Sequence, residues 1–362
     1  MDAMQAIQNM EVWSLLRYCE SVKNIKKIAK EQSNVTISSG LAFEIVWCLQ
    51  QAREYYSSAS NASVIVKPLL YFYGMVNFAE ARILIRAGNK RLCQLAEGHG
   101  LSTDWSDPTS ISSVKCQVTS RGTFVEFMDC LKNPQHVRTP NLEIVSTLTP
   151  TSSLVGHSFD LKWLFSRIPE LRSLYALTYR ERPNVLKAIP GYYSGGFLAL
   201  YFESRCPPDI PVTEAELRSL FPTLRDVKLT EHSRLYPDSG ITFQWDNWDH
   251  KPRELPPSIV KAPEEIPAIL KSEEIFIVAG DYNISEISLH YMTMYFLGML
   301  VRYRPELWMA ALNHRGDDDV MALIEKFLRV SSLKFPNLIL NEIAGEGHGL
   351  GLVIEKSKSP IK

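Results

Sequence analysis

Apolar residues recur at intervals of three and four positions through the first hundred residues of the chain, which is the pattern of helices with one apolar face. This pattern predicts helices over residues 11–30, 39–60 and 68–87. Pro68 fits the first turn of the third helix, where its missing N–H removes no helical hydrogen bond. Gly88 then supplies a residue type that commonly ends a helix. We therefore expect the N-terminal part of the chain to be helical.

The segment over residues 67–85 is apolar on nearly every side of a helix, yet it carries Tyr73, Asn77, Glu80 and Arg82. A helix that is apolar all round is buried within a protein. A charged group inside such a helix must be paired, because an unpaired buried charge is strongly destabilising. The sequence therefore predicts that these charges have a partner elsewhere in the chain.

From about residue 112 the pattern changes to the alternation of apolar and polar residues that is typical of β-strands. We predict a hairpin over residues 114–127, with its turn at residues 120–122. Further strands are predicted over residues 184–189, 197–203, 226–235, 241–245 and 275–278, and helices over residues 161–179 and 213–220. The stretch 250–267 is rich in proline and is expected to be an extended connector.

The C-terminal part returns to a helical pattern. A strongly apolar helix is predicted over residues 284–303, followed by two further helical stretches that end near residue 330. The segment 337–355 is predicted to form two short strands around a glycine-rich turn.

These elements together predict an α+β protein with three regions. Residues 1–105 form an N-terminal helical region, and residues 106–270 form a mixed middle region that ends in the proline-rich connector. Residues 271–362 contain the C-terminal helices and the terminal hairpin, which pack back on the N-terminal region. The expected result is a predominantly helical body with a strand-rich region inserted into it.

Composition places the chain among globular proteins and removes several functional classes. Of its 362 residues, 45% are hydrophobic and 22% are charged, and the formal net charge is -1, which is not the basic signature of a DNA-binding protein. Its six cysteines contain no C-x-x-C pair and are expected to be reduced thiols. The N-terminus does not have the pattern of a signal peptide, and the apolar run 291–301 is too short to span a membrane. We expect a cytoplasmic protein without a membrane partner.

Candidate sites for metals and cofactors are weak. Cys93 and His99 are the closest pair of soft ligands, and no third ligand lies near them in the sequence. The acidic run 317–319 precedes a predicted helix, where carboxylates interact favourably with the helix dipole. The glycine-rich segment 345–351, which contains His348, has neither the Walker A spacing nor the dinucleotide-binding spacing. We expect no metal and no cofactor.

The end of the predicted helix 284–303 carries Arg302, and Arg304 follows it directly. Arginine is favoured at a helix C-terminus and presents a fork of donors to carboxylates and phosphates. In a structural interpretation, Arg302 or Arg304 forms an ion pair with Glu80 or another buried carboxylate and fixes the C-terminal helix against the N-terminal helices.

A functional interpretation of the same residues is also open. Arg302 and Arg304 could line a polar pocket together with His290, Tyr73 and Asn77. Such a pocket would suit an anionic ligand, for example a nucleotide or the phosphates of RNA. The sequence does not decide between a pocket and a structural ion pair.

Two blocks, residues 52–85 and residues 287–308, resemble the YaaC-like family of bacterial proteins. Their sequences are AREYYSSASNASVIVKPLLYFYGMVNFAEARILI and ISLHYMTMYFLGMLVRYRPELW, and their order and separation fit a resemblance over most of the chain. The resemblance implies a bacterial cytoplasmic protein and brings no established catalytic residues.

Residues 71–81 also resemble the YYALFHAARA-type helix of HEPN domains, which are helical bundles found in RNases of toxin and phage-defence systems. HEPN nucleases use an Arg and a His on one helix, separated by four to six residues. In this chain only Arg225 and His232 have that spacing, and they flank a predicted strand. The resemblance therefore implies a HEPN-like helical scaffold without the RNase site.

Two functional hypotheses follow. The first is a non-enzymatic binding or interaction module, with a protein partner or self-association, that belongs to a bacterial defence or stress complex. It predicts an exposed apolar surface and no convergent polar pocket. The second is an enzyme acting on nucleotides or RNA, which predicts that Arg302, Arg304, His290 and Tyr73 meet in one cleft.

Overall fold

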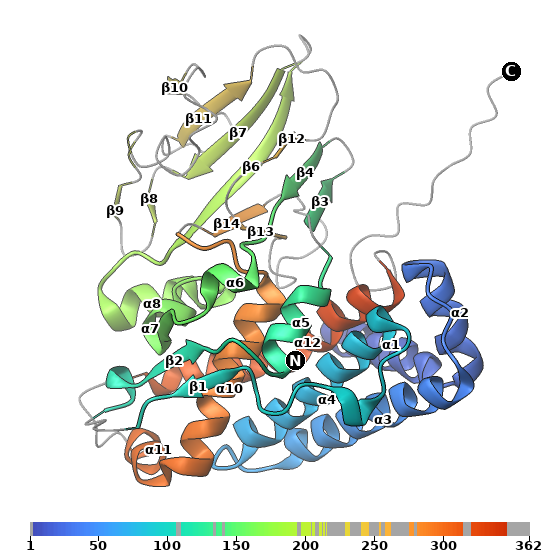
Figure 1. Cartoon of the computed structure of the whole chain (residues 1–362). Coiled ribbons are helices and arrows are strands. Elements are labelled where there is room, and N and C mark those ends of the chain that lie inside the picture. The colour runs from blue at the N-terminus through green and yellow to red at the C-terminus, as the bar shows by residue number, and fades with distance from the viewer. Residues whose placement is uncertain are drawn as a thin grey trace, which may run out of the picture.

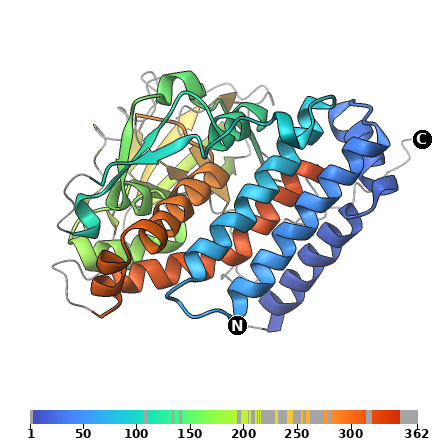
Figure 2. The same ribbon diagram turned by 60° about the horizontal axis from the view of Figure 1, so that its bottom comes forward.

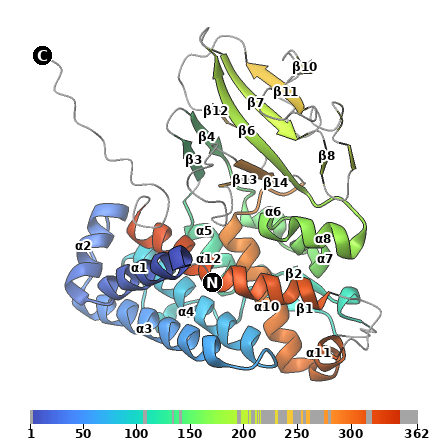
Figure 3. The ribbon, with the colours of Figure 1, turned by 180° about the vertical axis from the view of Figure 1, so that it is seen from behind.

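A computed structural model shows a helical body with a β-rich region above it (Figure 1). It describes residues 3–105, 110–132, 135–139, 142–193, 197–203, 205–206, 210–211, 213, 215, 229–231, 240–245, 253–254, 258–261, 275–278, 281–313 and 320–345. Seen from behind, the same arrangement holds, with α1 (Ala3–Cys19) and α12 (Met321–Ala344) on the near side of the helical body (Figure 3).

The described part of the N-terminal region is helical, as the apolar pattern predicts, but it contains four helices where the pattern predicts three. They are α1 (Ala3–Cys19), α2 (Val22–Ser33), α3 (Ser39–Asn61) and α4 (Lys67–Ala87). Ser38 caps α3, since its hydroxyl accepts a hydrogen bond of 3.1 Å from the N–H of Leu41. Gly88 ends α4 in the left-handed conformation at φ 73°. The predicted helix 11–30 is divided between α1 and α2, which are separated at residues 20–21.

The C-terminal region contributes three helices that return to the N-terminal ones. They are α10 (Glu286–Tyr303), α11 (Pro305–Leu312) and α12 (Met321–Ala344). Helix α4 contacts α3, α10 and α12, so it lies at the centre of the helical body. Figure 2 shows α3 and α4 side by side, with α12 behind them. The buried character of α4 follows from these neighbours.

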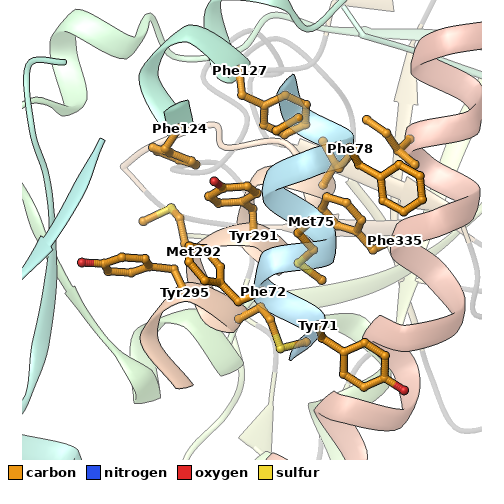
Figure 4. Packing of buried hydrophobic residues seen from close by; sticks show 14 of the residues in the cluster. Tyr71, Phe72, Met75, Phe78, Phe124, Phe127, Tyr291, Met292, Tyr295 and Phe335 are labelled. Atoms are coloured by element: carbon orange, nitrogen blue, oxygen red, sulfur yellow. The ribbon is translucent and has the colours of Figure 1, made fainter. Parts of the chain in front are cut away.

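Aromatic side chains fill the space between α4, α10 and the short helix α5 (Thr123–Cys130) (Figure 4). The ring of Phe72 packs edge-on against Tyr291, with 5.7 Å between the ring centroids. Helices α4 and α10 lie close together at Gly298, where an added Cβ would lie only 3.2 Å from the Cβ of Phe72. Glycine at this position therefore allows α10 to pack closely against α4.

The β-rich region is built on a six-stranded antiparallel sheet with the strand order β10-β11-β7-β6-β14-β13. Its strands are β6 (Val185–Tyr193), β7 (Phe197–Glu203), β10 (Leu229–Glu231), β11 (Gly240–Trp245), β13 (Ser258–Lys261) and β14 (Ile275–Val278). The predicted strands 197–203, 241–245 and 275–278 are confirmed. The predicted helix 213–220 lies largely outside the described residues.

Smaller elements connect this sheet to the helical body. A three-stranded sheet contains β1 (Leu101–Thr103), β2 (Lys115–Val118) and β5 (Ser158–Asp160); a second contains β3 (Gln135–Thr139), β4 (Leu142–Ser146) and β12 (Arg253–Glu254); and β8 (Arg205–Cys206) pairs with β9 (Ile210–Pro211). The short helices are α5 (Thr123–Cys130), α6 (Thr151–Leu154), α7 (Leu161–Phe165) and α8 (Arg172–Tyr179), and single 3-10 turns lie at η1 (Leu92–Gln94), η2 (Ile111–Ser113) and η3 (Pro169–Leu171).

The predicted hairpin at residues 114–127 is wrong in its second half. Strand β2 forms as predicted, but the chain then enters α5 at Thr123. The buried residues Phe124, Phe127 and Met128 are spaced by three and four positions, so all three lie on one face of a helix. The short apolar run does not by itself distinguish a strand from a helix.

The predicted terminal hairpin is wrong where the structure describes it. Helix α12 continues to Ala344, although Pro336 lies inside it. Phe335, Ile339 and Ile343 are buried along one face of this helix, which shows how packing sustains a helix that contains a proline. The rest of the segment, from residue 346, lies outside the described residues. The α+β class and the helical body are confirmed, and the limits of the three regions remain predictions.

Candidate functional site

Two of the predicted site residues meet at the surface. Arg302 at the end of α10 donates a hydrogen bond of 2.5 Å from Nη1 to the hydroxyl of Tyr73 on α4. Arg302 is exposed, and Tyr73 is half-buried and stacks on Tyr55. The amide of Asn77 donates to the backbone carbonyl of Tyr73 at 2.9 Å. Asn77 is therefore occupied within α4.

Arg304 has partners of its own. Its Nε donates to the carboxylate of Glu306, and its Nη1 donates to the backbone carbonyl of Trp105 at 3.3 Å. The hydrogen bond from Arg304 lowers the pKa of Glu306. These contacts hold Arg304 between the start of α11 and the loop after β1.

The predicted ion pair between Glu80 and these arginines is not present among the described residues. Glu80 is half-buried, and burial raises its pKa to about 7. The buried ion pair of α4 is instead formed by Arg82, whose Nε lies 3.3 Å from Oε2 of Glu342 on α12. The sequence correctly predicts a distant partner for a charge on this helix, but the residues are different.

His290 does not join Arg302 and Tyr73. It is fully buried, its Nδ1 lies 3.0 Å from the hydroxyl of Ser331, and its ring stacks on Phe327. Burial and the nearby ammonium of Lys334 lower the pKa of His290 to about 3. Its imidazole is therefore neutral and enclosed in the core, which excludes contact with a ligand in this conformation.

The remaining candidates from the sequence do not assemble into a site. Cys93 is an exposed free thiol, and His99 packs edge-on against Phe72 with 5.1 Å between the ring centroids. Among the residues that the structure describes, no group of three or more His, Cys, Asp or Glu side chains could hold a metal ion. Residues 317–319, His348, Arg225 and His232 lie outside the described residues.

A cleft of about 720 Å³ lies between α1, α3, α4 and α12 in the helical body. This volume is within the usual range for small-molecule sites. Its basic lining residues are Arg17, Arg53, Lys67 and Arg329. Its aromatic lining residues are Trp13, Tyr56 and Tyr71, and Glu325 is the acidic residue among the described ones that line it.

The basic residues of the cleft differ in their pairing. Arg53 is neutralised by Glu20, with 2.8 Å between Nε and Oε1, and by Glu54, with 2.6 Å between Nη1 and Oε1. Arg17, Lys67 and Arg329 form no ion pair with any carboxylate in the described part of the chain. Three cations are therefore available to an anionic ligand.

The aromatic residues form a continuous layer at the base of the cleft. The ring of Tyr56 lies 5.1 Å from that of Tyr71 and 5.5 Å from that of Trp13. The hydroxyl of Tyr56 is buried and has no hydrogen-bond partner among the described residues. Figure 4 shows that Tyr71 points to the side of α4 opposite Tyr291 and Tyr295. The cleft is thus separate from the aromatic core between α4 and α10.

Sequence reasoning missed this cleft. Its basic residues are spread from Arg17 to Arg329, and each has the ordinary sequence context of a cation on a helix surface. A local signal does exist, because Trp13 and Arg17, like Lys67 and Tyr71, are separated by four positions and lie on one helix face. That signal does not reveal which helices are neighbours.

Fold and cleft together define the class of the molecule, an α+β protein whose helical body carries a cationic cleft with an aromatic base. A model of the YaaC-like protein family matches residues 14–343. The chain therefore belongs to the YaaC-like protein family, as its two sequence blocks predict. No curated protein and no solved structure matches the chain. Within the described residues, the structure contains no helix with the length and apolarity needed to cross a bilayer.

Proposed function

We propose that the protein is a non-enzymatic binding module that holds an anionic ligand in the cleft between α1, α3, α4 and α12. The observation that carries this proposal is the convergence of Arg17, Lys67 and Arg329, without carboxylate partners in the described chain, on one concave surface. Unpaired cations on a shared concave surface create a positive potential that concentrates anions.

The composition of the cleft supports binding rather than catalysis. The described residues that line it include no His and no Cys, which are the commonest bases and nucleophiles. Burial raises the pKa of Tyr56 and Tyr71, so both hydroxyls stay protonated near neutral pH. Glu325 is exposed, and the hydroxyls of Ser60 and Ser332, which also line the cleft, donate to backbone carbonyls of their own helices.

The alternative is an enzyme that acts on nucleotides or RNA at the surface around Arg302 and Arg304. Arg302 is exposed there, and its contact with Tyr73 is the support for this alternative. The enclosure of His290 removes the only histidine that was predicted to act at this place. The binding module therefore has the stronger support.

A protein partner, self-association and membership of a bacterial defence or stress complex remain proposals. Phe43 and Trp47 are 49% and 53% exposed on α3, which supports the apolar surface of the first hypothesis, whereas the cleft is a polar pocket that this hypothesis does not predict. This surface is separate from the cleft residues named above.

Titration calorimetry with inorganic tripolyphosphate tests the proposed function. Two double variants each remove two cations, Lys67→Ala with Arg329→Ala in the cleft and Arg302→Ala with Arg304→Ala outside it. We expect the cleft variant to bind at least about ten-fold more weakly, and the other variant to bind as the wild type does. Binding by the wild type should also weaken at high salt.

Two results would contradict the proposal. If the wild type does not bind tripolyphosphate at low salt, the cleft is not an anion site. If only the variant at Arg302 and Arg304 loses binding, the anion site lies at the end of α10, as the alternative requires.

A further inference from the structure

The cations and the aromatic layer occupy different levels of the cleft. Along α3, Arg53 precedes Tyr56 by three residues and Ser60 follows it by four, so about 10 Å of helix axis separates Arg53 from Ser60. Lys67 donates to the backbone carbonyl of Ser60 at 3.5 Å, which places its ammonium at the Ser60 level. Tyr56 therefore lies between two cationic levels.

Arg17 lies at the same level as Arg53. Residue Glu20, which follows α1, is paired with Arg53, while Trp13 lies against Tyr56. The two helices therefore run in opposite directions at this point, and Arg17, one turn beyond Trp13, lies toward the Arg53 end.

Arg329 lies at the opposite end, with Lys67. Helix α12 runs in the same direction as α4, because Phe335 packs on Phe78 and Glu342 pairs with Arg82 farther along both helices. On α12, Arg329 comes before Phe335. On α4, Lys67 comes before Phe78, so both cations lie on the same side of the contact between the two phenylalanines. Lys67 and Arg329 therefore both lie toward the N-terminal ends of their helices.

From this arrangement we infer that the cleft binds a nucleotide, with its phosphates between Lys67 and Arg329 and its base against Trp13, the half-buried member of the aromatic layer, which rests on the buried ring of Tyr56. This inference rests on the proposed function and specifies the ligand. A Lys and an Arg are suited to a phosphate chain. Aromatic side chains bind the face of any base by stacking.

The unpaired hydroxyl of Tyr56 is further evidence for a ligand that carries hydrogen-bond acceptors. It is buried without a hydrogen-bond partner in the described chain, although Tyr56 lines the cleft. Buried polar groups are nearly always paired, so an unpaired hydroxyl beside a cleft marks a position that a ligand acceptor can complete. Arg17 offers further donors, at the opposite end from the phosphate pair, for the acceptor edge of a base.

Calorimetric titration of the wild type with ATP, GTP, CTP, UTP and inorganic tripolyphosphate tests this inference. At least one nucleotide should bind about ten-fold or more tightly than tripolyphosphate, because base stacking adds to phosphate binding. Tyr56→Phe should weaken nucleotide binding by about three-fold or more and leave tripolyphosphate binding unchanged. Arg304→Ala, which lies outside the cleft, serves as the control and should change neither affinity.

The outcomes separate this inference from the proposed function. If tripolyphosphate binds as tightly as every nucleotide, or if Tyr56→Phe and Trp13→Ala both leave the nucleotide advantage intact, the ligand is not a nucleotide, while the anion site stands. If none of the five compounds binds, both proposals fail. Tyr56→Phe retains the packed ring and removes only the unpaired hydroxyl, so it is expected to fold.

Discussion

Arg82 of α4 and Glu342 of α12 are separated by 260 residues and form an ion pair in the interior, with 3.3 Å between Nε and Oε2. The side chain of Arg82 is 4% exposed and that of Glu342 is 11% exposed. The same carboxylate oxygen accepts a hydrogen bond of 3.3 Å from the N–H of Lys132, which follows α5. One carboxylate thus connects α4, α12 and the chain after α5.

Glu342→Ala should therefore destabilise the fold strongly. It leaves the guanidinium of Arg82 buried without its carboxylate, and removing one partner of a buried pair typically costs about 3–5 kcal/mol. Urea unfolding measures the change in the free energy of unfolding. Glu325→Ala on the exposed side of the same helix is the control and should stay within about 0.5 kcal/mol of the wild type. Equal stability of the two variants would contradict a structural role for this pair.

Gly74→Ala should disturb the aromatic layer of the cleft. A Cβ at this position would lie 2.6 Å from Cδ2 and 2.8 Å from Cε2 of Tyr56, whose ring is fixed by packing. We expect a loss of about 1–3 kcal/mol in unfolding free energy, measured by urea unfolding. At Gly40, which lies in α3, the nearest atom to an added Cβ is 3.8 Å away, so Gly40→Ala should be neutral or stabilise by up to about 1 kcal/mol. If both variants lose stability equally, contact with Tyr56 is not the cause.

Lys334→Met should destabilise the fold, because Lys334 forms buried ion pairs close to His290. The ammonium of Lys334 is enclosed between the carboxylates of Glu170 and Glu286, which join η3 and α10 to α12. Its removal leaves two carboxylates without this cation, and we expect a loss of about 3–5 kcal/mol by thermal or urea unfolding. Lys326→Met, on the same helix and without an ion pair in the described chain, is the matched control. If Lys334→Met lowers the unfolding free energy no more than Lys326→Met does, the ion pairs of Lys334 do not stabilise the fold.

The sequence predicts the helical body well because its signals are local. The buried nature of α4 and the end of the helix at Gly88 follow from periodicity and from turn chemistry. The partner of Arg82 does not follow, because the segment containing Glu342 has the short apolar pattern of a strand. Only packing against α4 and α1 shows that Pro336 is tolerated and that this segment continues α12.

The cleft illustrates the same limit for a functional site. Helical spacing places Trp13 and Arg17 on one face, but the same spacing occurs on ordinary solvated helices. The lining residues form a cleft because α1 and α12 lie beside the hairpin of α3 and α4. That placement depends on contacts between segments that are distant in the sequence. Conversely, His290 has the sequence features of a site residue, and its burial beside Ser331 is visible only in the fold.

Glu80 gives a prediction for the dependence of stability on pH. It has no ion pair among the described residues, and burial raises its pKa from 4.5 to about 7. Its neighbours Cys48 on α3 and Tyr291 on α10 stay neutral in this range, because burial raises the pKa of Cys48 to about 12 and that of Tyr291 well above its usual value. Glu80 is therefore the titrating group at this place.

The sign follows from proton binding. Between pH 4.5 and about 7, native Glu80 keeps a proton that the unfolded chain has released, so raising the pH through this window lowers the stability of the fold. Glu80→Gln removes this dependence. Its unfolding free energy should match that of the wild type near pH 4.5 and exceed it by up to about 3 kcal/mol above pH 7. Urea unfolding across this range checks the prediction, with Glu325→Gln as the exposed control; a difference that does not change with pH would show that Glu80 is ionised in the native state throughout.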